Sequence, residues 1–134
     1  MLKRINTAIP CILDVDASQY HTGGVFLQPS NDIHKTISQP SLETLNLIPV
    51  SFTSHKLIPS QQRYSAHEQE ALATIQALQT WREWIDDCDI WVRMDHETLT
   101  SLRKQVNLPR QIQRFVDIFE QYNSKILYRR GKTN

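Results

Sequence analysis

The sequence of 134 residues has little of what marks non-globular or cysteine-stabilised chains. With only 3 glycines and 6 prolines, it is neither collagen-like nor a proline-rich low-complexity chain. Its 2 cysteines, Cys11 and Cys88, match no zinc or haem spacing; two thiols in a reducing compartment are the simpler interpretation, and a disulfide between them stays open. No apolar run approaches the roughly 18 residues of a membrane-spanning helix. No apolar stretch follows the basic pair near the N-terminus, so we expect a protein that is not secreted.

What is present predicts a single domain over residues 1–134, with 40% apolar and 22% charged residues. The net charge of +1 conceals an asymmetry. Residues 1–102 carry 7 Lys/Arg against 12 Asp/Glu, a net of −5, whereas residues 103–134 carry 8 against 2, a net of +6. An acidic body with a basic end suggests that one part holds cations and the other contacts an anionic polymer. A solvated basic tail is an equally good interpretation.

Local patterns predict five strands and three helices. Ser65-Ala66-His67-Glu68 has the form of a capping box and begins the clearest helix. Pro109 suits the start of another helix. Residues 29–46 are polar without a firm period, which predicts a long loop. The predicted strands are 11–16, 24–28, 47–53, 90–95 and 125–129, and the predicted helices begin near residues 65, 97 and 109.

The order of these elements is strand-strand-strand-helix-strand-helix-helix-strand. Three strands in a row favour an antiparallel meander, and strands separated by helices favour parallel crossovers. We therefore expect an α/β fold with a mixed five-stranded sheet flanked by helices.

Three acidic residues stand out by position. Asp16 ends the first predicted strand, Glu70 lies in the first turns of the long helix, and Asp95 ends the fourth strand. Strand ends and adjacent helices can converge on one spot, and carboxylates gathered there favour hard cations such as Mg²⁺ or Mn²⁺. Two such ions would suit phosphodiester cleavage. The pattern alone also fits ordinary acids at strand ends.

Two other acidic residues compete for these roles. Glu68 has a structural explanation as the capping-box partner of Ser65, whereas Glu70 has none and is the better ligand candidate. Asp14 shares a strand face with Asp16, so periodicity does not separate the two.

The basic end offers candidates for phosphate contact. Arg110 and Arg114 are four residues apart on a predicted helix, opposite its apolar stripe, which is also typical of a solvated face. For the tryptophans, core packing is favoured over base stacking. The tryptophans are Trp81, Trp84 and Trp91, and the candidates for nucleic-acid contact are Arg110, Arg114, Arg129, Arg130 and Lys132.

Five segments, in order over residues 10–134, resemble one family. They are Asp16-Ala17-Ser18 with Gly24–Gln28, Pro49–Leu57, Tyr64–Ala73, Asp95–Leu99, and Arg114-Phe115 with Ile126–Asn134. They resemble the motifs "DAS…GavLxQ", "PIaYxSrkL", "YsxxEkEaLA", "TDHxsL" and "RW…ixYrpGkxN". These belong to the ribonuclease H domain of Ty3/gypsy-type LTR-retrotransposon reverse transcriptases.

The resemblance implies a ribonuclease H-like fold and metal-dependent hydrolysis of the RNA strand of an RNA/DNA hybrid, with two Mg²⁺ or Mn²⁺ ions. Carried over residue by residue, it makes Asp16, Glu70 and Asp95 the catalytic acids and metal ligands. It implies two partners, the hybrid and the polymerase domain of the same polyprotein, and a place in the cytoplasm, within a virus-like particle, or in the nucleus. The residues to which it assigns no catalytic part are Asp14, Glu68 and His96.

The sequence departs from the family pattern in three ways. Residues 29–46 form a longer link than is usual and are expected to be a loop insertion. Met94 and Phe115 stand where Thr and Trp are usual. The family continues after "GkxN" with a helix that supplies a fourth metal-ligating Asp, whereas this sequence ends at Asn134, so we expect a fold that lacks the C-terminal helix. The alternative function is a catalytically weak or inactive module, truncated or domesticated, that binds nucleic acid or a protein partner.

Overall fold

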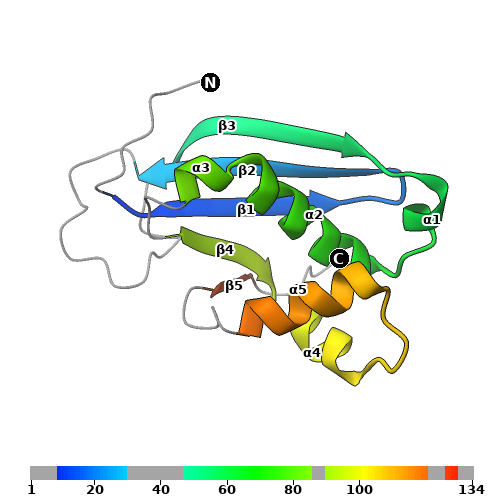
Figure 1. The fold of residues 1–134 in the computed structure, drawn as a ribbon. Helices are drawn as coiled ribbons and strands as arrows, with labels where there is room; N and C mark the ends of the chain where they lie inside the picture. Colours follow the sequence, from blue (N-terminus) through cyan, green and yellow to red (C-terminus); the bar gives the residue numbers. More distant parts are fainter. Residues whose placement is uncertain (1–8, 30–46, 86–89, 121–125, 130–134) are drawn as a thin grey trace.

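A five-stranded mixed sheet organises the chain (Figure 1). The structure is a computed structural model, and it describes residues 9–29, 47–85, 90–120 and 126–129. The predicted α/β class and the predicted sheet are confirmed. Across the sheet the strands lie in the order β3 (Leu47–Lys56), β2 (His21–Pro29), β1 (Cys11–Ala17), β4 (Ile90–Asp95) and β5 (Ile126–Arg129).

Strand direction follows from how the strands are connected. β1 pairs antiparallel with β2 and β2 with β3, because consecutive strands can fold back on each other. β4 pairs parallel with β1, and β5 pairs parallel with β4, because helices carry the chain back across the sheet. The predicted antiparallel meander followed by parallel crossovers is therefore confirmed.

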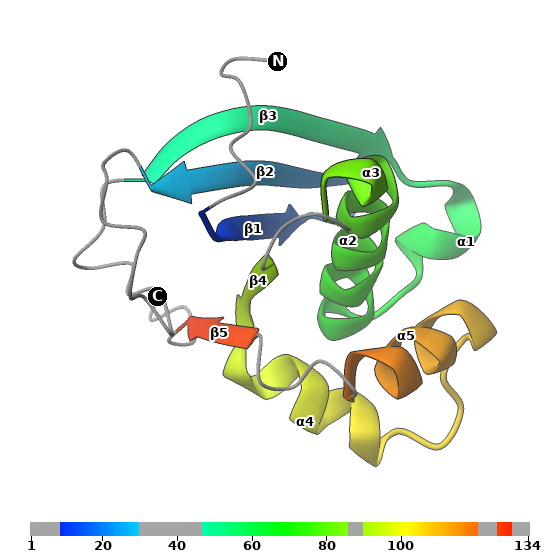
Figure 2. The ribbon, with the colours of Figure 1, turned by 60° about the vertical axis from the view of Figure 1, so that its left-hand side comes forward.

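The helices gather around the ends and one face of this sheet. The long helix α2 (Ala66–Thr80) contacts β1 and β2, and the helices α4 (His96–Lys104) and α5 (Arg110–Glu120) pack against α2 and against each other (Figure 2). Among the residues that the structure describes, no helix is long and apolar enough to span a membrane. The helices are α1 (Pro59–Gln62), α2 (Ala66–Thr80), α3 (Arg82–Ile85), α4 (His96–Lys104) and α5 (Arg110–Glu120).

A capping box sets the start of α2. The Ser65 hydroxyl accepts a hydrogen bond from the backbone N–H of Glu68 at 3.2 Å, and the Glu68 carboxylate accepts one from the N–H of Ser65 at 2.8 Å. Two of the N–H groups that a helix start leaves without partners are satisfied in this way. The box was predicted from the sequence, and it gives Glu68 a structural role.

The main core lies between α2 and the sheet. Leu13, Phe26 and Leu72 are fully buried there. The Phe26 ring meets Trp81 and Trp84 edge-on, with ring centroids 5.5 Å and 5.3 Å apart. These contacts support core packing as the role of both tryptophans.

The two faces of the sheet are packed in different ways. At Gly24 a Cβ atom would lie 3.2 Å from the Thr53 methyl and 3.4 Å from the Ala77 Cβ, so glycine lets α2 approach β2 closely. On the opposite face Trp91 packs with Ile12 in a smaller cluster, which supports packing as the role of the third tryptophan.

Several element bounds differ from the predicted ones. β2 begins at His21 instead of residue 24 and includes Pro29, because pairing with β3 keeps both ends extended: His21 pairs with Lys56 and Pro29 with Leu47. β3 continues to Lys56 because Lys56 pairs with His21 of β2, and the short helices α1 and α3 were not predicted. Residues 30–46 of the expected loop insertion lie outside the described residues.

We expect Ser65→Ala to lower the free energy of unfolding by about 0.5–2 kcal/mol, because it removes the hydroxyl that caps α2. Urea denaturation followed by circular dichroism measures the change. Ser54→Ala on the exposed side of β3 is the matched control, with an expected change within about 0.5 kcal/mol. An equal effect of both substitutions would contradict the capping role.

Candidate active site

Parallel pairing brings Asp16 and Asp95 to the same end of the sheet. Asp14 on β1 is the register partner of Arg93 on β4. The pairing ends at these two residues, and Asp16 and Asp95 each follow two residues further along β1 and β4, at the same end of the sheet. The carboxyl ends of neighbouring parallel strands therefore supply two of the three predicted acids.

Glu70 joins this strand end from α2. Its Oε1 atom accepts a hydrogen bond from the backbone N–H of Asp95 at 2.9 Å and a second from the Thr98 hydroxyl, also at 2.9 Å. Glu70 is half-buried and Thr98 is fully buried. The two contacts fix the Glu70 side chain against the junction of β4 and α4.

Asp95 is at once the last residue of β4 and the N-cap of α4. Its Oδ1 atom accepts a hydrogen bond from the N–H of Glu97 at 2.9 Å. The positive end of the α4 dipole therefore lies beside two carboxylates, those of Asp95 and Glu70. This polarity offsets part of their mutual repulsion.

Asp16 is the exposed member of the set. Its Oδ1 atom accepts a hydrogen bond from the N–H of Ala17 at 3.0 Å. Its register partner on β2 is Gly23, so no side chain stands beside the carboxylate on that strand. The Asp16 side chain is thus accessible from solvent.

The three acids lie at one strand end without closing around a common point. Within the described ranges, no three His, Cys, Asp or Glu side chains are arranged so that they could hold a metal ion. Asp16 and Asp95 each direct one oxygen to a backbone N–H of their own segment instead. The donor set still has the right chemistry, because carboxylate oxygens are the ligands that Mg²⁺ and Mn²⁺ prefer.

Asp14, the competitor of Asp16, is engaged elsewhere. Its Oδ2 atom lies 3.0 Å from Nη1 of Arg93, in an ion pair across β1 and β4. Asp14 and Asp16 share a strand face, as predicted, but this contact gives Asp14 a structural role.

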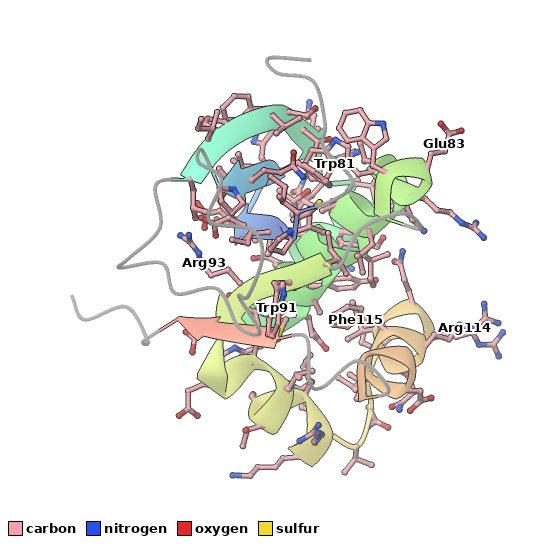
Figure 3. The ribbon with its side chains drawn as sticks, turned by 90° about the vertical axis from the view of Figure 1, so that its left-hand side faces the viewer. Trp81, Glu83, Trp91, Arg93, Arg114 and Phe115 are labelled. Carbon is pink, nitrogen blue, oxygen red and sulfur yellow. The ribbon has the colours of Figure 1, made fainter. Side chains whose placement is uncertain are left out.

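The predicted nucleic-acid contacts fall into two groups. Arg110 and Arg114 are exposed on α5, and Figure 3 shows Arg114 pointing outward while Phe115 points toward the interior. Arg129 is the register partner of Asp95, which places its backbone at the strand end that carries the acids. Arg130 and Lys132 lie outside the described residues.

Comparison with known proteins decides the family. A family model described as the RNase H-like domain found in reverse transcriptase matches residues 6–122. The chain belongs to this family.

Relatives of this RNase H-like domain are found in retroelements. The chain is 27% identical over 133 residues to a retrovirus-related Pol polyprotein from transposon opus of Drosophila melanogaster, with 95% of the chain and 12% of the polyprotein covered. It is 30% identical over 87 residues to the Pol polyprotein from transposon gypsy of the same species, with 64% and 8% covered. The chain thus spans about a tenth of the length of these relatives, and the predicted Ty3/gypsy resemblance is confirmed.

A solved structure supports the fold. The chain is similar to the foamy viral protease-reverse transcriptase in complex with RNA/DNA hybrid, with a TM-score of 0.67 and 14% identity, over 99% of this chain and 16% of that one. The predicted ribonuclease H-like fold is confirmed.

Two residues near the acids of this RNase H-like domain were not predicted from the sequence. Thr98 donates to Glu70, and the His67 Nδ1 atom lies 3.2 Å from the Thr98 hydroxyl oxygen. The only local signal is the position of Thr98, three residues after a capping Asp95 at a helix start. Their meeting depends on how α2 packs against α4.

A double-mutant cycle on Asp14→Asn and Arg93→Met checks the ion pair. We expect a coupling of about 0.5–1 kcal/mol that weakens at high salt, because both side chains are partly exposed. Thermal or urea unfolding of the four proteins measures it. Strictly additive effects at low salt would contradict the pairing of Asp14 with Arg93.

Proposed function

We propose that this RNase H-like domain is a metal-dependent endonuclease that hydrolyses the RNA strand of RNA/DNA hybrids. The observation that carries the proposal is the hydrogen bond from the Asp95 N–H to Glu70, at the end of the sheet to which the parallel strands β1 and β4 carry Asp16 and Asp95. Three acids at one end of the sheet cost stability through the repulsion of like charges, and bound cations would offset this cost.

Asp16, Glu70 and Asp95 would hold Mg²⁺ or Mn²⁺, with two ions expected. When bound, such ions activate a water nucleophile and stabilise the leaving oxygen of a phosphodiester. The chain's own residues prepare the site. The α4 start and Thr98 hold the Glu70 carboxylate in place, and Asp16 stays exposed at the point where a substrate can approach.

Charge supports a hybrid as the substrate. The exposed Arg110 and Arg114 lie on α5, which packs against α2 and α4, the helices that carry Glu70 and follow Asp95. Arg129 lies beside Asp95 in the sheet register. Such side chains bind phosphates without reading base sequence, and an RNA/DNA hybrid is recognised by its shape and its 2′-hydroxyls.

Membership in a Pol polyprotein is part of the same proposal. The similar foamy viral enzyme is a reverse transcriptase in complex with RNA/DNA hybrid, and the curated relatives are Pol polyproteins. We infer that a polymerase domain of the same polyprotein is the natural partner of this domain.

Asp16→Asn and Asp95→Asn should each lower the rate of hybrid cleavage by at least about 100-fold. The reason is that even residues that only orient a metal ligand cost about 10–100-fold when they are removed. A gel assay with labelled RNA in a hybrid measures cleavage, with Mg²⁺ and with Mn²⁺. Asp14→Asn is the matched control and should keep most of the activity, since its carboxylate pairs with Arg93. Equal loss in all three variants would count against the assignment.

Arg110→Ala with Arg114→Ala should weaken hybrid binding and flatten its dependence on salt. Each phosphate contact removed lowers the slope of log affinity against log salt by roughly 1. Filter binding or fluorescence anisotropy at several salt concentrations measures the slope. The control is Arg82→Ala, an exposed arginine on α3, which should leave the slope unchanged. An unchanged slope in the double variant would rule out α5 as a phosphate-binding surface.

The alternative is a module that binds nucleic acid and cleaves nothing. It is favoured by the absence, in the described residues, of three acids arranged to hold one metal ion. Salt-dependent hybrid binding without cleavage by the unsubstituted chain, in either Mg²⁺ or Mn²⁺, would select this function over the nuclease.

A further inference from the structure

We propose that His67 and Thr98 are positioning residues for Glu70, joined in a directed hydrogen-bond relay from the His67 ring through the Thr98 hydroxyl to the Glu70 carboxylate. The relay itself follows from geometry, and its catalytic consequence rests on the proposed nuclease function. The three side chains come from two helices, His67 and Glu70 from α2 and Thr98 from α4.

The contacts of Glu70 determine which group donates in each hydrogen bond of the relay. Its Oε1 atom receives two donors, the Asp95 N–H and the Thr98 hydroxyl, both at 2.9 Å. Because this oxygen accepts a hydrogen bond from each of the two groups, it donates no hydrogen to either of them. The single hydrogen of the Thr98 hydroxyl is therefore directed to Glu70.

The direction of the Thr98 hydrogen bond also determines whether Nδ1 of His67 carries a hydrogen. Nδ1 of His67 lies 3.2 Å from Oγ1 of Thr98. Because that hydroxyl has already given its only hydrogen to Glu70, Oγ1 acts here as an acceptor and Nδ1 must carry the hydrogen. The contacts thus place a hydrogen on Nδ1 of His67, and in the neutral ring this is the Nδ1–H tautomer.

Burial makes the relay persistent. Thr98 is fully buried, so its hydroxyl has no ready exchange with bulk water, and His67 is half-buried at the first turn of α2. Removing a partner from a buried hydroxyl costs more than the same loss at the surface.

The consequence is a preset carboxylate. The terminal torsion of a glutamate side chain is broad, so an unrestrained carboxylate samples many orientations. Two donors on Oε1 restrict this rotation, and His67 holds the hydroxyl that supplies one of them. Glu70 is then oriented before any ion or substrate arrives, which lowers the cost of binding.

The first test reads the tautomer in the full chain without added metal. Long-range ¹H–¹⁵N NMR spectra should show His67 with the hydrogen on Nδ1 and the exposed His21 as the ordinary Nε2–H form. Thr98→Val should shift His67 toward Nε2–H, and Thr98→Ser should restore the Nδ1–H form. A neutral His67 ring with its hydrogen on Nε2 and none on Nδ1 in the unsubstituted chain would overturn the relay, whatever the enzymatic activity.

Thr74→Val is the matched structural control. Thr74 is also fully buried and also bonds Glu70, but its hydroxyl donates to the Glu70 backbone carbonyl at 3.0 Å. This variant loses a similar buried hydroxyl without touching the carboxylate. The His67 tautomer should stay as it is in the unsubstituted chain, and a shift equal to that of Thr98→Val would reduce the relay to a general packing effect.

The second test reads metal binding by calorimetry with Mn²⁺ alone. Thr98→Val should weaken binding by about 10-fold or more, Thr98→Ser should restore it, and Thr74→Val should leave it unchanged. His67→Ala should weaken it by a smaller factor and add nothing in the double variant with Thr98→Val, because both act through one contact. If Thr98→Val fails to fold, the Mn²⁺ affinity of His67→Ala still tests the positioning role.

The two tests separate the relay from the nuclease. If the unsubstituted chain binds no Mn²⁺, the proposed function and the positioning role are both overturned. The NMR result still decides whether the relay exists. Chain that binds Mn²⁺ with equal affinity in the unsubstituted, Thr98→Val and His67→Ala forms overturns the positioning role alone.

Discussion

The arrangement of the acidic site depends on one oxygen atom, Oε1 of Glu70. Two donors from the same short segment converge on it, the backbone N–H of Asp95 and the hydroxyl of Thr98. This contact ties α2 to the point where β4 ends and α4 begins. Because β4 is also paired in register with β1, the position of α2 relative to Asp16 is set at the same time. Residues from three distant parts of the chain thus share one reference point.

Local pattern was sufficient for most of the fold. The apolar run at Ile90 gave β4 with its observed bounds, and the Ser65–Glu68 pair gave the start of α2, because strand and capping signals lie within a few neighbouring residues. The extent of β2 was not predictable in this way. His21 and Pro29 have weak strand preference and are held extended by their partners on β3, Lys56 and Leu47.

The three candidate acids could be predicted from their places at strand and helix ends and from motif resemblance, but the side-chain contacts around them could not. Periodicity could not separate Asp14 from Asp16, because residues two apart point to the same face of a strand. The distinction depends on Arg93, which is 79 positions away from its partner in the sequence. Thr98 and His67 were missed for the same reason, since no local pattern records which side chains meet when two helices pack.

Asp95 has two roles that tolerate different substitutions. As the N-cap of α4 it needs a side chain that accepts a hydrogen bond, and Asn and Ser serve a helix start about as well as Asp, whereas Ala does not. As a candidate ligand it needs a negative charge, which neither Asn nor Ser supplies. A copy of this domain can therefore lose the charge at this position and keep its fold. Among decayed copies that still produce folded protein, position 95 should have drifted to Asn or Ser more often than to Ala or Val.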